Sequence, residues 1–301
     1  MNSLYLILKK TVTVWLLLFT VATSVNLYAQ EQESDELDLI LDDLFFNDQQ
    51  LIDDILDSFN TYNFLYTNIS FNSNTYFSGR DSGVNQFNLV PQLSYYSSFG
   101  LYASISGLYY ETFDPNWDFT NVSVGYYNTI DKKKLVNYNI SYTRYFYSDG
   151  WDTFTNSIDF SIGIRNKTKT LGTKLASSYL FGKDTSLQLV SRNFASLTLT
   201  KQKNYIVKFR PQLNFIIAQQ TIALAQLDNA ETNSIIEYEY DDIFDLLNTQ
   251  INLPISLATK SWDFELGYNV NFPSAIGTET DLKTTSYFNL SIGYLIDLDK
   301  K

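Results

Sequence analysis

The sequence predicts an all-β fold: a closed antiparallel transmembrane β-barrel of about 12 strands, preceded by a signal peptide and a short acidic helical segment. Three observations predict this fold. From residue 62 onward, apolar residues alternate with small polar ones over long runs. The chain begins with the layout of an export signal. The connections between the predicted strands fall into a short set and a long set that alternate along the chain.

Residues 1–29 have the three parts of a secretory signal peptide. Two lysines end a short positive region, residues 11–22 form an apolar core, and Ala29 offers a small residue for cleavage before Gln30. The alternative is an uncleaved anchor, but the core of about a dozen residues is short of the roughly 20 that a spanning helix needs. No cysteine follows the core, so the sequence predicts an exported protein that is not a lipoprotein.

Residues 30–61 form an acidic segment. Positions 31–60 hold eleven acids and no base, and they supply most of the net charge of −12. Apolar residues recur at helical spacing on both sides of a break near Asn47 and Asp48. Two short amphipathic helices with acidic outer faces are one interpretation, and a solvated, partly disordered linker is the other.

From residue 62 onward the apolar period is two. The run from Trp262 to Phe272, for example, places an apolar residue at every second position. Runs of this kind reach ten or more residues, whereas an ordinary soluble strand has about five or six and a tilted membrane-spanning strand about 9–11. Strand length therefore favours a barrel with its apolar face toward lipid over an exported soluble β-sandwich. The predicted strands cover residues 63–78, 85–97, 101–112, 118–130, 135–147, 151–165, 170–182, 185–200, 204–220, 248–259, 261–273 and 284–298.

The connections set the predicted orientation, because bacterial barrels have short periplasmic turns and longer external loops. The short set is 98–100, 131–134, 166–169, 201–204 and 260–261, and the longer set is 79–84, 113–117, 148–150, 221–247 and 274–283. Aromatic residues near both ends predict two interfacial belts. One belt contains Tyr95, Tyr96, Tyr126, Tyr127 and Trp262, and the other contains Tyr109, Tyr110, Tyr145, Phe146, Tyr147 and Trp151.

This pattern resembles the small outer-membrane β-barrels of Gram-negative bacteria, and its Asn- and Tyr-rich composition is similar to that of barrels from Bacteroidota. The resemblance covers about residues 62–298 and implies an outer-membrane location. It rests on pattern and not on a motif, so no functional residue is carried over. Many such barrels end in an aromatic residue, whereas this chain ends at Lys301 without one.

Composition excludes several functions. The chain has no histidine and no cysteine, which rules out Ser-His-Asp chemistry, thiolate nucleophiles and His or Cys metal ligands. The sequence therefore predicts a protein that is not an enzyme and that uses no metal or cofactor. An acidic net charge disfavours nucleic acid as a partner. The predicted partners are outer-membrane lipid, a small solute and a periplasmic protein.

Charged residues at inward positions of the predicted strands are the candidate lumen residues. They are Lys174, Arg192, Lys208, Arg210, Asp159, Asp263 and Glu265. The basic members lie on neighbouring strands, and a basic wall would favour anionic solutes. The alternative interpretation is a set of ion pairs that fills a narrow barrel. Arg144 falls on the lipid-facing parity near the external end, where its side chain could reach anionic headgroups.

The short turns are basic, and the acidic segment begins on the same side. The rim lysines are Lys132, Lys133, Lys134, Lys167, Lys169, Lys201, Lys203 and Lys260. One hypothesis is that residues 30–61 dock on this rim and cover or plug the mouth. The predicted function is then a passive channel for small solutes, with anions favoured by the basic wall. The alternative is a non-conducting structural or docking barrel that binds a partner through the acidic segment or through loop 221–247, which either projects as a hairpin or folds into the lumen.

Overall fold

The structure is a computed structural model that describes residues 63–81, 85–112, 114–130, 132–150, 153–227, 236–276 and 279–299. The predicted signal peptide (1–29), the acidic segment (30–61) and Trp151 lie outside these residues. None of the described residues belongs to a helix with the length and apolar character of a membrane span.

The described residues form one large sheet and one small hairpin. The strands of the large sheet are β1 (Phe64–Asn72), β4 (Asn88–Tyr96), β5 (Leu101–Tyr110), β6 (Trp117–Thr129), β7 (Val136–Tyr147), β8 (Asn156–Arg165), β9 (Leu171–Phe181), β10 (Thr185–Ala195), β11 (Leu197–Lys201), β12 (Tyr205–Phe209), β13 (Gln212–Leu227), β14 (Ile236–Asn252), β15 (Ile255–Thr259), β16 (Trp262–Pro273) and β17 (Thr285–Asp297). The small hairpin pairs β2 (Tyr76–Phe77) with β3 (Arg80–Asp81).

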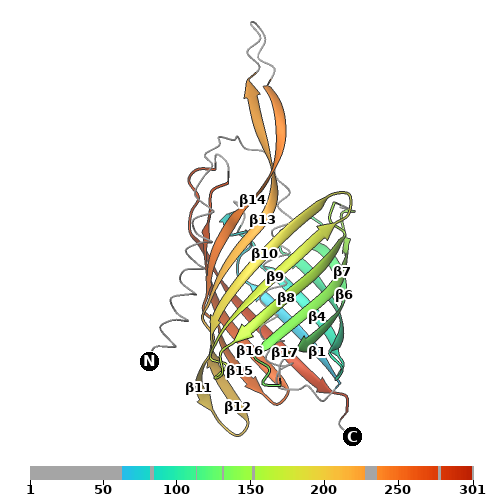
Figure 1. The fold of residues 1–301 in the computed structure, drawn as a ribbon, viewed down its shortest axis with the longest axis vertical. Coiled ribbons are helices and arrows are strands. Elements are labelled where there is room, and N and C mark those ends of the chain that lie inside the picture. The colour runs from blue at the N-terminus through green and yellow to red at the C-terminus, as the bar shows by residue number, and fades with distance from the viewer. Residues whose placement is uncertain are drawn as a thin grey trace.

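Pairing between the first and last strands closes the sheet (Figure 1). β1 pairs on one side with β4 and on the other with β17, from Phe64 opposite Asp297 to Asn72 opposite Asn289. β10 and β11, β12 and β13, and β14 and β15 each follow one another along one line of the wall. When each of these three pairs is counted as one strand, the described residues form a closed antiparallel barrel of 12 strands. This confirms the predicted fold class.

Two of the three interruptions in these neighbouring strands have a covalent cause. Proline has no N–H to donate to a ladder, so it interrupts pairing where it falls within a strand. Pro211 separates β12 from β13, and Pro254 separates β14 from β15. Their carbonyls still accept hydrogen bonds, from Ala195 N to Pro211 O (3.0 Å) and from Arg210 N to Pro254 O (3.0 Å). The wall therefore stays continuous across these interruptions.

Burial alternates along the strands and identifies the two faces of the wall. In β1, Asn68 is 1% exposed whereas the adjacent Ile69 is 56% exposed. The same alternation runs through β17, where Leu290 and Ile292 face outward and Asn289 and Ser291 face inward. The outward face is a band of aliphatic and aromatic side chains, as lipid requires.

The segment predicted as loop 221–247 is largely strand. β13 and β14 pair continuously from Gln212 opposite Asn252 to Leu227 opposite Ile236, and Figure 1 shows them continuing beyond the barrel as a two-stranded ribbon. The predicted end of one strand at 220 and start of the next at 248 were wrong. The acidic residues there favoured a loop in the sequence, yet apolar residues still occupy alternate positions between them. Below, the end with this ribbon is called the hairpin end, and the opposite end is called the short-turn end.

The predicted strand 63–78 was too long. β1 ends at Asn72, and the chain then turns at Ser73 and Asn74 before it enters the small β2–β3 hairpin. The polar turn residues around Ser73 end the ladder, since they favour local side-chain-to-backbone bonds over strand pairing.

The predicted aromatic belts are split between the two faces of the wall. Trp262 and Phe146 are 47% and 54% exposed and face outward. Tyr96, Tyr127, Tyr110 and Tyr145 are at most 5% exposed and face inward, and Tyr147 lies beside this inward group. Consecutive residues of a strand point to opposite faces, so a run such as Tyr95-Tyr96 cannot supply two lipid-facing rings.

The two chain ends of the barrel are joined by Asn63 and Asp299. The carboxylate of Asp299 accepts from the backbone N–H of Asn63 (2.7 Å) and from its side-chain amide (3.1 Å). These hydrogen bonds, the backbone one first, lower the pKa of Asp299. They fasten the seam between β1 and β17 just outside the last strand pair.

We expect Asp299 to titrate below the ordinary aspartate range. In Asn63→Ala the pKa of Asp299 should rise only part of the way to the ordinary aspartate value, because the backbone N–H of residue 63 still donates to its carboxylate. A depressed folded-state pKa stabilises the folded protein above the unfolded pKa, and this contribution is lost as pH falls through the folded pKa. Carboxyl NMR titration in detergent micelles measures the shift. An ordinary value in the unaltered protein would contradict the clasp.

Gly125 provides a test of packing inside the wall. It pairs directly with Tyr102, and a Cβ at Gly125 would overlap the ring of Tyr102. We expect Gly125→Ala to destabilise the barrel by about 1–3 kcal/mol through overpacking. In a Tyr102→Ala background, Gly125→Ala should lower the free energy of unfolding by less, since the ring that the new methyl group would meet is absent. Urea unfolding in micelles measures both, and equal costs in the two backgrounds would refute the contact.

Candidate functional site

The lumen is the candidate site, and one side of it is a hydrogen-bonded wall of amides. Asn214 Nδ2 donates to Gln250 Oε1 (3.0 Å), Gln250 Nε2 donates to Asn271 Oδ1 (3.1 Å), and Asn271 Nδ2 donates to Thr285 Oγ1 (3.2 Å). This series of hydrogen bonds crosses β13, β14, β16 and β17. None of these four residues is more than 8% exposed. The wall here is a packed polar core, which orders the strands from the inside.

Two of the predicted lumen cations lie directly opposite each other. Lys174 on β9 is the register partner of Arg192 on β10, and the two residues are 5% and 2% exposed. Gly163 on β8 and Asn214 on β13 flank them in the next strands. Two positive charges side by side in a poorly hydrated space are costly unless negative charge compensates them.

The other two cations lie nearer the short-turn end. Arg210 is 4% exposed and sits where β12 gives way to β13, and Lys208 is half-buried on β12. Lys208 is the register partner of Ser256, and Ser256 is in turn the partner of Glu265. The structure therefore brings one predicted acid to the same level as a predicted cation, two strands away.

The remaining predicted acids are placed differently. Asp263 is 8% exposed and lies one inward position closer to the short-turn end than Glu265. Asp159 lies on β8, where Ser157 Oγ donates to its carboxylate (2.9 Å) and Ser141 Oγ lies 3.5 Å away. The register partner of Lys174 on β8 is Gly163, so the structure does not place Asp159 beside that cation.

The predicted rim lysines all lie at or beside the turns of the short-turn end. Six of the eight are exposed, whereas Lys134 and Lys169 are half-buried in turns with φ of 54° and 56°. Within the described ranges, no group of three or more His, Cys, Asp or Glu residues could hold a metal ion.

An apolar cluster fills the lumen at the hairpin end, where polar lining was expected. Its members are Val90, Leu108, Tyr110, Phe119, Tyr145, Phe154, Leu180, Ala218, Leu247 and Ile276, and all are at most 5% exposed. Leu247 reaches it through a β-bulge, because pairing shifts between Ile216 and Ile217 and leaves Leu247 as the extra residue. The sequence contains a signal for this cluster. The inward positions of the strands are apolar near the hairpin end, and they are Asn or Ser further toward the short-turn end.

Aromatic side chains also gather inside the short-turn end. Phe64 stacks on Tyr96 with centroids 4.9 Å apart, and Tyr96 stacks on Tyr102 at 5.7 Å. Tyr66, Tyr127 and Leu295 complete the cluster. The charged lumen residues therefore lie between two clusters of buried rings and aliphatic side chains.

Residues 73–81, called here the inward arm, fold into the lumen at the hairpin end. Ser78 is 1% exposed, and the carbonyl of Gly79 accepts a hydrogen bond from Thr285 Oγ1 (2.7 Å). Gly79 has φ +81°, and a Cβ there would lie 2.8 Å from the side chain of Asn271. Only glycine fits this contact. The amide chain across the wall thus ends on the arm.

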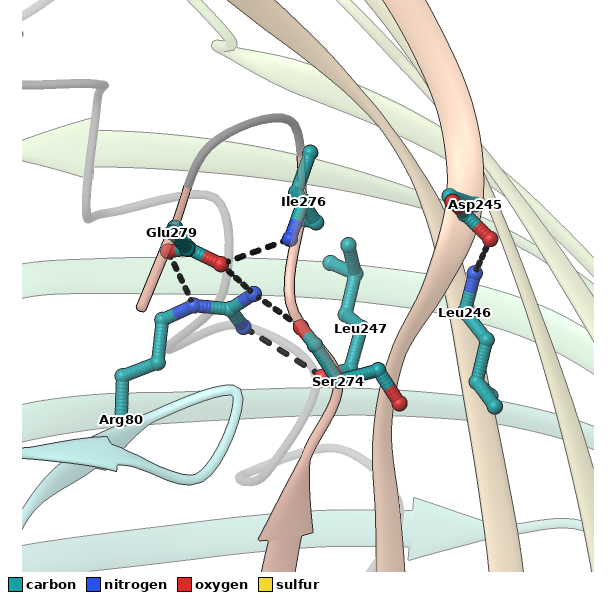
Figure 2. A network of polar contacts seen from close by, with 7 residues as sticks. All are labelled: Arg80, Asp245, Leu246, Leu247, Ser274, Ile276 and Glu279. Atoms are coloured by element: carbon teal, nitrogen blue, oxygen red, sulfur yellow. Dashed lines mark hydrogen bonds and ion pairs between the residues drawn. The ribbon is translucent and has the colours of Figure 1, made fainter. Parts of the chain in front are cut away.

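Arg80 fastens the arm to the connection between β16 and β17, as Figure 2 shows. Its Nε and Nη2 donate to the two carboxylate oxygens of Glu279, both at 2.8 Å. It also donates to Ser274 O (2.8 Å) and Leu247 O (3.3 Å), while Ile276 N donates to Glu279 (2.9 Å). Sequence reasoning missed Arg80 and treated this stretch as strand end and loop. A lone arginine after Ser78-Gly79, a turn signal, was the available clue.

No protein-family model matches the sequence, and no curated protein is similar to it. Solved outer-membrane barrels are similar in form. The KdgM porin is 10% identical, with 77% of this chain and 98% of that chain covered and a TM-score of 0.43. The NanC porin is 11% identical, with 76% and 98% covered and a TM-score of 0.42. The translocator domain of autotransporter NalP from Neisseria meningitidis is 10% identical, with 90% and 99% covered and a TM-score of 0.42.

Proposed function

We propose that this protein is an outer-membrane channel for small solutes that favours anions, and that residues 30–61 close it from the periplasmic side. The observation that carries the proposal is the cluster of inward cations on adjoining strands, Lys174, Arg192, Lys208 and Arg210. A wall of one sign focuses the field across a narrow lumen and raises the local concentration of the opposite ion. The absence of histidine and cysteine favours transport over catalysis.

The plug follows from charge and connectivity. β1 enters the wall at the short-turn end, where Asn63 meets Asp299. The segment before it carries eleven acids and no base, and the rim beside it carries the exposed lysines. Exposed ion pairs are individually weak and screened by salt, but acids brought near Lys174 and Arg192 would act in a less hydrated space. Closure from this side would therefore bring negative charge toward the end of the lumen where the predicted cations lie.

A second candidate function is a non-conducting docking barrel. The observation in its favour is the ribbon of β13 and β14, which extends beyond the wall (Figure 1). The apolar cluster at the same end would impede ions if it never opened. A partner would then bind the ribbon from outside or the acidic segment from the periplasm.

Removing residues 31–60 should raise the frequency and size of conductance steps in planar bilayers, because the plug is lost. Full-length protein recorded under the same voltages is the comparison. High salt should partly mimic the deletion in the full-length protein, since screening weakens the charge contacts. Unchanged conductance after deletion would refute the plug. Silence from both proteins would favour the docking barrel.

Lys174→Gln together with Arg192→Gln should reduce anion selectivity in the protein lacking residues 31–60. The reversal potential under a KCl gradient should shift toward zero, because the positive wall is halved. Arg144→Gln is the matched control, as this arginine is exposed on the outer face and bonds Thr155 and Asn156 (both 3.1 Å). If the control and the double variant behave alike, the lumen cations do not set selectivity.

A further inference from the structure

We propose that the inward arm and the apolar cluster form a gate at the hairpin end of the lumen, and that Arg80 is its latch. This inference rests on the proposed channel function, and it concerns a second closure, at the end opposite the acidic segment. The gate consists of the inward arm on one side and the apolar cluster on the other.

The arm contacts the lumen wall on several strands. Asn88 Nδ2 on β4 donates to Thr75 Oγ1 (2.9 Å), and Thr285 on β17 bonds Gly79. The ring of Tyr76 lies 6.0 Å from that of Tyr287, an inward residue of β17. The arm therefore occupies space inside the barrel and does not lie over its edge.

The apolar cluster closes the space that the arm leaves. Leu108, Leu180 and Leu247 are at most 1% exposed, and they come from β5, β9 and β14 on different parts of the wall. Phe119 packs edge-on against Tyr145, with ring centroids 5.8 Å apart. A dry apolar constriction is a barrier to ions even without a complete steric seal.

Arg80 is suited to act as a reversible fastener. Its fork meets Glu279 in the bidentate geometry that gives strong, directional ion pairs. The side chains of Arg80 and Glu279 remain 15% and 35% exposed, so water can reach the pair when it opens. The same guanidinium also bonds the carbonyl of Leu247, whose side chain lies in the apolar cluster. Release of Arg80 thus loosens both parts of the gate together.

Cysteine labelling tests the latch without requiring conductance. The chain has no cysteine, so Ser78→Cys introduces a single thiol at a position 1% exposed. Ser78 Oγ makes no hydrogen bond among the described residues, so the substitution removes none. The full-length protein in nanodiscs is treated with a charged maleimide. Ser148→Cys, exposed at the same end, is the accessible control.

We expect Ser78→Cys to label slowly in the unaltered background and about tenfold faster with Arg80→Ala, a change equivalent to about 1.4 kcal/mol in the opening equilibrium. Arg80→Lys, which keeps the charge but loses the fork, should lie between them. Glu279→Gln removes the carboxylate of the same ion pair, so it should also make Ser78→Cys label faster. Arg144→Ala is the matched control and should change nothing. Heat-modifiable gel mobility verifies that each barrel has folded.

The latch is overturned if Ser78→Cys labels as fast as Ser148→Cys in the unaltered background. It is also overturned if folded Arg80→Ala and Glu279→Gln proteins both label at the unaltered rate. Bilayer recordings of the same proteins separate the two proposals. Faster labelling with Arg80→Ala but no conductance in any of the proteins would support the latch and refute the channel. Conductance that rises on deletion of 31–60, with labelling unmoved by Arg80→Ala, would refute the latch alone.

Discussion

Backbone hydrogen bonds between β1 and β17 turn an open sheet into a closed wall, and every other feature of the molecule follows from that closure. In lipid an unpaired strand edge leaves a row of polar groups without partners, at several kcal/mol each. The clasp of Asn63 on Asp299 lies where this seam meets water. Closure also fixes an inside and an outside, so each strand must place one set of side chains against lipid and the other in a confined lumen.

The lumen resembles a polar protein core more than a water-filled pipe over much of its wall. Amides and hydroxyls bond one another across strands, from Asn214 to Thr285, and continue onto the backbone of Gly79. Such a network specifies strand order and register from within, because a slip of one residue would break many bonds at once. Two cations lie in the same polar wall, since Lys174 and Arg192 are register partners on β9 and β10.

The two proposed closures would depend on different physical interactions. At the hairpin end, buried apolar side chains meet an arm held by one bidentate ion pair and by backbone contacts. At the short-turn end, stacked tyrosines lie inside the wall, and lysines crowd the turns outside it. A molecule with one apolar and one electrostatic closure would respond to two kinds of signal. Ionic strength would act mainly on the second, since screening weakens charge contacts and leaves apolar burial intact.

The sequence by itself determined the barrel, its strand number and the inward or outward side of most strand residues, because a period of two is a local property of extended backbone. It also predicted charged residues at inward positions, among them Lys174 and Glu265. Tertiary structure alone decided that the stretch after Asn72 turns inward, that Leu247 bulges into the lumen, and that β13 and β14 run on as a ribbon. Arg80 and Glu279 are 199 residues apart. A contact of that span depends on barrel closure bringing two loops together, which no local pattern records.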